Sequence, residues 1–221
     1  MSETAKPVIA IIGGTGDLGS GLASGWAKAG YKVVLGSRSR DKAVDHAARY
    51  EANVTGEDNV GAAREGDIVI VAVPFSNHAA ILREIKAEIQ GKIVIDAVVP
   101  LFPPKVSTVQ LPPDGSAALA ARRILGDSVR LVSAFHTVGA AKLRAGVKAE
   151  SDVLVFSDDR EARDAAIELA NVVARRGVSG GTLANSVAAE AMTAVLIWIN
   201  RHYKVNGAGI MISGLEAKDP P

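Results

Sequence analysis

Short apolar runs alternate with amphipathic stretches along most of the chain. The runs are rich in β-branched residues and continuous, as is typical of parallel strands that helices cover on both faces. The strands expected on this basis are residues 8–12, 32–35, 67–73, 92–99, 129–135 and 153–156. Helix candidates between and after them include 77–89, 117–125 and 185–203. This order predicts an α/β fold, a Rossmann-like, doubly wound and mostly parallel sheet.

The rhythm breaks once, at residues 101–116, which contain four of the nine prolines. Proline lacks a backbone donor and disfavours helix in the residue before it. We expect an ordered but irregular excursion, either a binding loop or lid or a plain surface insertion. We expect one domain over 1–137 and a smaller C-terminal portion, helical and βα, over 138–221. The alternative is a single domain that contains both.

The last long helix has an apolar stripe whose members are Ala188, Met192, Val195 and Ile199. Residues three and four apart lie on the same face of a helix. This stripe indicates either a core face or a contact between two copies of the chain, and we expect a homodimer.

Composition narrows the function classes. The 221 residues are 48% hydrophobic and 22% charged, with 25 Lys and Arg against 24 Asp and Glu, so the chain should form a packed core and not remain disordered. No charge run suits nucleic acid or an anionic membrane, and no uninterrupted apolar run reaches the roughly 18 residues of a membrane span. The absence of Cys is compatible with a reducing compartment, and we expect a cytoplasmic protein with no metal site.

A glycine motif follows the first expected strand and opens a helix. Gly14, Gly16 and Gly19 satisfy the pattern G-x-G-x-x-G in this strand-turn-helix context. Gly14 would allow the tight turn, Gly16 would let the backbone approach a pyrophosphate, and Gly19 would let helix and strand pack closely. The alternative is a tight turn with no ligand. The motif predicts a dinucleotide site at this turn.

The end of the second strand distinguishes between the two nicotinamide nucleotides. An acidic residue about 20 positions after the glycines would bind the ribose hydroxyls of NAD, but residues 36–40 read GSRSR. Ser37, Arg38 and Arg40 suit a 2′-phosphate, so we expect NADP, bound by the domain over 1–137. The alternative for the two arginines is an ordinary solvated turn.

Two further strand ends lie at the edge where ligands bind in open α/β sheets. Val73, Pro74 and Phe75 close one expected strand, and Val98 to Pro100 close the next. We expect these residues to line the nicotinamide site. The prolines could also simply stop the strands.

One histidine follows a strand directly. His136 comes after the run 129–135 and should face the same edge as the nicotinamide. The chain lacks the Tyr-x-x-x-Lys pair of short-chain dehydrogenases and a G-x-S-x-G elbow. His136 is therefore the candidate catalytic residue, with a packed structural histidine as the equal alternative.

Four segments together resemble the F-420-dependent NADP reductase family, namely 13–19 (GGTGDLG), 36–38 (GSR), 133–137 (SAFHT) and 183–186 (LANS). The resemblance covers nearly the whole chain in order. It implies hydride transfer between NADP(H) and coenzyme F-420, an 8-hydroxy-5-deazaflavin with an anionic tail, both of them small-molecule substrates. It also implies a cytoplasmic, commonly dimeric enzyme.

The resemblance further implies residue roles. Those around the pyrophosphate are Thr15, Gly16, Asp17 and Leu18, and those at the 2′-phosphate are Ser37, Arg38 and Arg40. Pro74 and Phe75 would flank the nicotinamide. Those forming or adjoining the deazaflavin pocket are Val98, Pro100, His136, Thr137, Val138, Asn185, Ser186, Gly207 and Ala208. Asp17 adds a carboxylate at the phosphate turn, which opposes anion binding unless the side chain caps the helix.

Two other functions remain open. The first is an NADPH-dependent reductase of another flavin, a ferric complex or an imine, which would use the same fold with a different second pocket. The second is a non-catalytic NADP(H) sensor that signals through a partner surface on the C-terminal helix.

Overall fold

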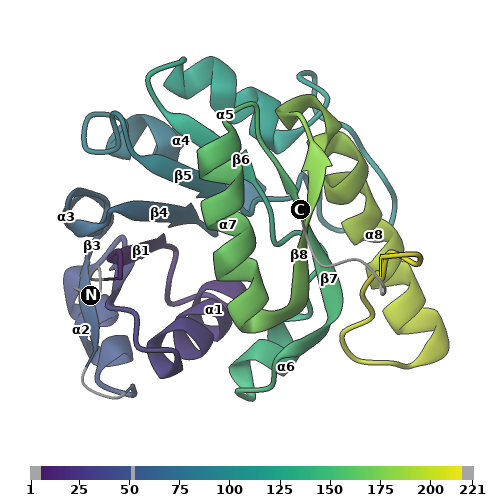
Figure 1. The fold of residues 1–221 in the computed structure, drawn as a ribbon, viewed down its shortest axis with the longest axis horizontal. Helices are drawn as coiled ribbons and strands as arrows, with labels where there is room; N and C mark the ends of the chain where they lie inside the picture. The colour runs from purple at the N-terminus through teal and green to yellow at the C-terminus, as the bar shows by residue number, and fades with distance from the viewer. Residues whose placement is uncertain (1–5, 51–52, 216–221) are drawn as a thin grey trace.

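The computed structural model describes residues 6–50 and 53–215. Within them, one sheet has the strand order β3-β2-β1-β4-β5-β6-β7-β8 (Figure 1). Its strands are β1 (Ile9–Ile12), β2 (Val33–Ser37), β3 (Val54–Asp58), β4 (Ile68–Val71), β5 (Ile93–Asp96), β6 (Arg130–Ser133), β7 (Ala149–Phe156) and β8 (Ala174–Gly181). Neighbouring strands are parallel except β6 and β7. The predicted α/β class and mostly parallel sheet are confirmed.

Helices connect the strands. They are α1 (Asp17–Lys28), α2 (Arg40–Ala47), α3 (Asn59–Glu65), α4 (Phe75–Ile85), α5 (Ala117–Leu125), α6 (Ala140–Arg144), α7 (Arg160–Val173) and α8 (Ser186–Tyr203), with a 3-10 turn η1 (Leu183–Asn185) before α8. The helix expected at 117–125 is confirmed. The helix expected at 77–89 begins two residues earlier and ends at Ile85, and the last helix follows η1. Residues 101–116 contain neither helix nor strand, as predicted.

Two strands were missed, and both lie at the edges of the sheet. The sequence of β3 is VTGED and that of β8 is ARRGVSGG, so neither forms an apolar run. Edge strands of natural proteins often carry charge, which prevents pairing with other chains. Three expected strands were also too long, because β4, β5 and β6 end two or three residues before their apolar runs do.

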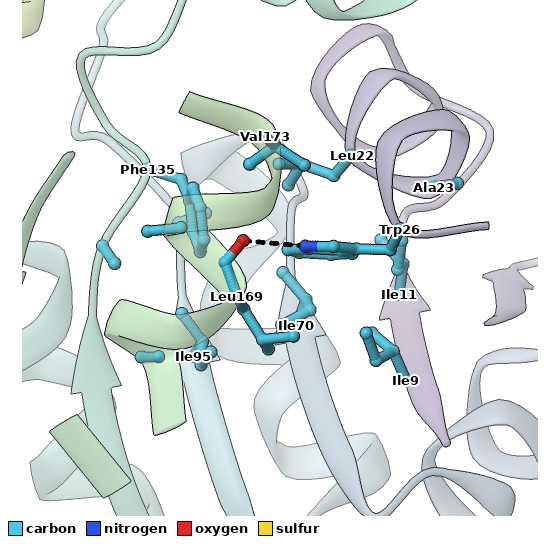
Figure 2. Packing of buried hydrophobic residues seen from close by; sticks show 14 of the residues in the cluster. Ile9, Ile11, Leu22, Ala23, Trp26, Ile70, Ile95, Phe135, Leu169 and Val173 are labelled. Atoms are coloured by element: carbon cyan, nitrogen blue, oxygen red, sulfur yellow. Dashed lines mark hydrogen bonds between the residues drawn. The ribbon is translucent and has the colours of Figure 1, made fainter. Parts of the chain in front are cut away.

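The core lies on both faces of the sheet. Successive residues of a strand point to opposite faces, and Ile9 and Ile11 pack in one apolar cluster while Ala10 and Ile12 pack in the other. In the first cluster, Trp26 of α1 donates a hydrogen bond from Nε1 to the carbonyl oxygen of Leu169 in α7 at 3.0 Å (Figure 2). These contacts hold α1, and with it the glycine turn, firmly on the sheet.

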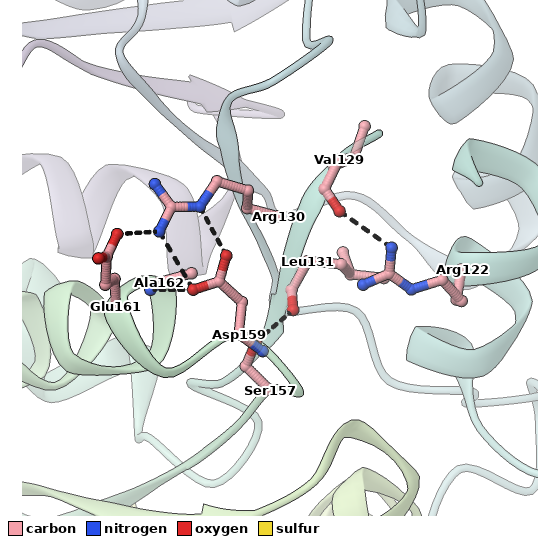
Figure 3. A network of polar contacts seen from close by, with 8 residues as sticks. All are labelled: Arg122, Val129, Arg130, Leu131, Ser157, Asp159, Glu161 and Ala162. Carbon is pink, nitrogen blue, oxygen red and sulfur yellow. Dashed lines mark hydrogen bonds and ion pairs between the residues drawn. The ribbon is translucent and has the colours of Figure 1, made fainter. Parts of the chain in front are cut away.

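A polar network fastens the C-terminal strands to the rest of the sheet. The pairing of β6 with β7 is short, with Ser133 opposite Phe156. Beside it, Arg130 forms two hydrogen bonds with Asp159, at 2.6 and 3.1 Å, and one with Glu161 at 2.9 Å (Figure 3). The hydrogen bonds from Arg130 lower the pKa of Asp159 to about 2. Strands before and after residue 137 thus belong to one continuous sheet.

One helical segment among the described residues, Leu183–Tyr203, is long and apolar enough to cross a membrane by length and composition. Its mean hydropathy is 1.3, and 33% of the window is buried inside the protein. The core helix of a globular protein can meet the same criterion, so this finding is weak evidence for a membrane.

Candidate functional site

The glycine turn joins β1 to α1 at the carboxyl edge of the sheet. The backbone amides of Gly13 and Gly14 both donate to the carbonyl oxygen of Gly36, at 3.0 and 3.1 Å, which ties the turn to β2. A Cβ on Gly19 would lie 2.7 Å from the carbonyl oxygen of Gly13, so helix and turn can approach this closely only without a side chain.

The glycine pattern assigned the tight turn to Gly14, but the residue that reverses the chain is Gly13. Gly13 has φ +81°, a conformation that residues with a Cβ rarely adopt. Gly14 is needed for space, because its Cβ would lie 2.8 Å from the carbonyl oxygen of Ile11. The pair of adjacent glycines was the signal in the sequence for this division of roles.

The N-terminus of α1 can receive an anion. Gly16 is the N-cap residue, and without a side chain it offers no oxygen to the first amides of the helix. Thr15 precedes it in the turn, and Leu18 is partly buried in the first turn of the helix. These unsatisfied amides and the helix dipole favour a phosphate group at this position.

Asp17 does not act as the helix cap, because the N-cap position belongs to Gly16. Its carboxylate accepts a hydrogen bond from Nη1 of Arg144 at 2.6 Å. Arg144 ends α6, and that helix packs on α1 so closely that a Cβ on Gly21 would lie 2.7 Å from Cβ of Leu143. A cation from the C-terminal half therefore offsets the negative charge at the phosphate turn.

The loop after β2 carries the residues predicted for the 2′-phosphate. Arg38 is exposed, and Ser37 lies partly buried at the end of β2. Arg40 differs from Arg38, because its guanidinium makes two hydrogen bonds to Glu57 of β3, at 2.8 and 2.9 Å. β3 was not predicted, so this partner could not be foreseen. Arg38, which is exposed on the same loop, is therefore more available to a ligand than Arg40 is.

The ends of β4 and β5 lie at the same edge. Val73 follows β4, Pro74 is the N-cap of α4, and Phe75 begins that helix instead of closing a strand. The ring of Phe75 packs edge-on against Phe102, with ring centroids 5.4 Å apart. The proline-containing excursion thus contacts the residue predicted to flank the nicotinamide.

Val98 and Pro100 belong to the loop after β5 and not to the strand itself, and both are buried. Asp96, the last residue of β5, accepts a hydrogen bond from the amide of Val98 at 3.1 Å. The carboxylate therefore shapes the first turn of this loop.

A cavity of about 210 Å³ opens between the segment that follows β6, the helix α8 and the C-terminal segment 206–208. Five residues that the sequence assigned to the second pocket line it, namely His136, Thr137, Val138, Gly207 and Ala208. The other four residues assigned to that pocket, Val98, Pro100, Asn185 and Ser186, do not line the cavity. The Asn185 amide donates to the carbonyl oxygen of Gly180, and the buried Ser186 hydroxyl bonds the hydroxyl of Ser116.

Gly139 gives the cavity a close-packed wall. A Cβ on Gly139 would lie 2.8 Å from Cα of Gly207, so the two glycines bring the C-terminal segment against the turn that follows His136. Asn200 of α8, which the sequence analysis missed, accepts a hydrogen bond from the amide of Ala208 at 2.9 Å. It holds that segment in place.

His136 is turned toward the cavity by an unusual backbone. Phe135, directly before the histidine, has φ +69°, and its ring centroid lies 5.7 Å from that of Trp26. Packing of this ring in the core offsets the strain of the backbone. Nε2 of His136 lies 3.0 Å from Oγ of Ser133, and its carbonyl oxygen accepts a hydrogen bond from Thr193 of α8.

His136 is a neutral imidazole at neutral pH. Burial lowers its pKa to about 4, against the opposing effect of Asp96. Its Nδ1 is buried without a hydrogen-bond partner among the described residues. A buried polar atom without a partner is costly, so Nδ1 suits a polar group of a ligand.

The chain is similar in sequence to known reductases. A family model described as NADP oxidoreductase, coenzyme F-420-dependent, matches residues 8–100. The F-420-dependent NADP reductase of Methanocaldococcus jannaschii is 39% identical over 222 residues, which cover 94% of this chain and 99% of that protein. The enzyme of the same name from Methanothermobacter marburgensis is also 39% identical, over 94% and 98%.

A crystal structure from Arthrobacter sp. FB24, assigned provisionally as an F-420-dependent NADP reductase, has a TM-score of 0.79 and covers 94% of this chain and 100% of that chain. At 19% identity this likeness concerns the fold alone. The identity to the two archaeal enzymes extends over nearly the full length of each chain, and we conclude that this protein belongs to the F-420-dependent NADP reductase family.

Proposed function

We propose that the protein transfers a hydride between NADP(H) and coenzyme F-420. The observation that carries this proposal is the cavity lined by the segment 136–138, which starts from the same sheet edge as the glycine turn and the Arg38 loop. The name of the archaeal relatives supports the choice of the two substrates.

The nucleotide half of the site fits NADP. The amides at the start of α1 lack a capping side chain and would receive the pyrophosphate, with Thr15, Gly16, Asp17 and Leu18 around it. Arg38 and Ser37 would hold the 2′-phosphate, and Pro74 and Phe75 would flank the nicotinamide.

The second half fits a flat ring with polar edges. The deazaflavin, when bound, supplies the carbon that accepts or donates the hydride. The protein's part is to orient the two rings and to exclude water, since hydride transfer between rings needs little acid or base from side chains. Nδ1 of neutral His136 would hydrogen-bond the ring, and the close contact of Gly139 with Gly207 would shut the cavity on one side.

The direct test is anaerobic oxidation of NADPH by the purified protein with coenzyme F-420, followed through the deazaflavin absorbance. Parallel reactions use NADH as donor and FMN as acceptor. Rapid bleaching that requires both NADPH and coenzyme F-420 is the expected result. If the protein binds NADPH but no acceptor oxidises it, the proposed hydride transfer is wrong and the protein is a nucleotide sensor.

Replacing His136 by alanine should lower turnover about 10- to 100-fold and leave the Kd for NADPH within twofold, because one hydrogen bond in the second pocket is lost. His136→Asn is the matched variant, since an amide can reach the position of Nδ1, and it should recover part of the loss. Turnover and NADPH binding are measured on the same preparations. Unchanged turnover in His136→Ala would remove the histidine from the reaction.

We also propose a cytoplasmic homodimer in which α8 packs on α8 of a second copy. Met192 and Val195 are 37% and 40% exposed on the apolar stripe of this helix, and Trp198 is 49% exposed beside it. The opposite side of α8 carries Glu190, buried against α5. A second copy, in place of a lipid bilayer, would cover the stripe.

Val195→Lys should convert a dimer to a monomer in sedimentation velocity, because a charge would enter the apolar interface. Val44→Lys is the matched control, since Val44 is similarly exposed but lies on α2. A wild-type monomer, or a Val195→Lys dimer, would contradict this interface.

A further inference from the structure

Four ionisable side chains gather behind the cavity, each from a different element. They are His78 of α4, Asp96 at the end of β5, His136 after β6, and Glu190 of α8, with exposed fractions of 1%, 1%, 7% and 2%. The cavity lining includes His136 but not the other three. Burying a charged group costs free energy unless the group is paired, so a cluster of four buried ionisable side chains indicates more than structural packing.

His78 and Asp96 form a buried ion pair. Nε2 of His78 lies 2.9 Å from Oδ2 of Asp96, and Oδ1 accepts the hydrogen bond from the amide of Val98. Burial acts to lower the pKa of His78, but the charges of Asp96 and Glu190 outweigh it and raise that pKa above its ordinary value. His78 therefore keeps a proton where a free histidine would begin to lose it.

Asp96 of this pair lies at the end of β5, beside the strand end that leads to His136. Asp96 and Ser133 stand opposite each other in the register of β5 and β6. Oγ of Ser133 is 3.0 Å from Nε2 of His136, and a hydroxyl can donate and accept at once. The order from the interior to the cavity is thus His78, Asp96, Ser133 and His136, and it ends at the unpartnered Nδ1.

Glu190 adds a second carboxylate to the same region. Its two oxygens accept hydrogen bonds from the amides of Ala117 and Ala118, at 2.6 and 3.1 Å. Burial raises its pKa to about 7, and Asp96 adds to that rise. The charged groups that act on His78 are therefore two carboxylates, which together favour a proton held in this region.

We propose that the His78–Asp96 pair is a buried proton store that serves the cavity through Ser133 and His136. The inference rests on the proposed function, in which NADPH, an acceptor ring and one proton give NADP and the reduced ring. The N–H bond at Nε2 of His78 breaks and Oδ2 of Asp96 takes the proton. The proton then crosses between the neighbouring ends of β5 and β6 to the Ser133–His136 pair, where Nε2 of His136 accepts it and His136 releases its other proton from Nδ1. The reverse reaction returns a proton by the same route, and exchange with solvent restores the store.

The first test needs no substrate. Imidazole resonances of His78 and His136 are followed by NMR from pH 4 to 9 in the wild type, in Asp96→Asn and in Ser133→Ala. We expect Asp96→Asn to lower the pKa of His78, and Ser133→Ala to change the response of His136 to the titration of His78. Two independent titrations in the wild type, untouched by Ser133→Ala, would overturn the relay.

The second test measures the pH profile of NADPH oxidation for the wild type, for His78→Gln and for the matched control His46→Gln. His46 is a partly buried histidine on α2. His78→Gln should lose about 10- to 100-fold in kcat at pH 8, far less at pH 6, and nothing in KM for NADPH, because solvent must then supply the proton. A loss that is equal at all pH values would mean a purely structural pair. No activity of the wild type with coenzyme F-420 would refute the proposed function instead, and the NMR titration would still decide the relay.

Discussion

NADPH binding is expected to weaken about 10- to 100-fold when Arg38 is replaced by alanine, while NADH binding stays within twofold. Arg38 is exposed on the loop after β2, and a hydrogen bond from a guanidinium to a phosphate contributes about 1.5–3 kcal/mol. NADH lacks the 2′-phosphate, so its binding does not depend on this hydrogen bond. Fluorescence titration of both nucleotides measures the two affinities.

Two arginines serve as controls for this variant. Arg49→Ala removes the same charge outside the loop and should leave both affinities unchanged. Arg40→Ala should have a smaller effect than Arg38→Ala, since Arg40 already makes two hydrogen bonds to Glu57. Equal losses for NADPH and NADH in Arg38→Ala would show that the residue does not recognise the 2′-phosphate.

Gly16→Ala should separate nucleotide binding from folding. Gly16 has φ −79°, which alanine tolerates, and a Cβ there meets only the carbonyl oxygen of Gly13, at 3.2 Å. The melting temperature of the free protein should fall by no more than about 2–4 °C. The Kd for NADPH should rise about 10- to 100-fold, because the methyl group would occupy space that the pyrophosphate needs.

Gly19→Ala is the contrasting variant. Its Cβ would lie 2.7 and 2.8 Å from backbone atoms of Gly13 and Gly14, which cannot move aside without opening the turn. Both melting temperature and NADPH affinity should therefore fall. Wild-type affinity in Gly16→Ala would mean that the nucleotide does not approach the backbone at this residue.

The central strands could be predicted because they are buried on both faces and consist of apolar residues throughout. β3 and β8 could not, because an edge strand contacts the core on less of its surface and its sequence stays polar. The same limit affected the nucleotide loop. Arg40 looked equivalent to Arg38 in the sequence, and only its pairing with Glu57 of the unpredicted β3 distinguishes the two.

The cavity residues that were predicted lie in short segments with a recognisable order, such as His136 to Val138. The buried cluster behind them had no such signal. His78 and Asp96 are 18 positions apart, and Glu190 lies in a distant helix. These side chains come together only in the folded chain, and local patterns in a sequence do not record such long-range proximity.

The short helix α6 spans both halves of the site. Ala140 and Ala141 at its beginning line the cavity, and Arg144 at its end pairs with Asp17 at the phosphate turn. At about 1.5 Å per residue, these two ends belong to one small rigid body. A phosphate that drew Arg144 toward itself would also shift the cavity wall. We therefore expect the binding of one substrate to change the affinity for the other, and by thermodynamic reciprocity the factor would be the same in both directions.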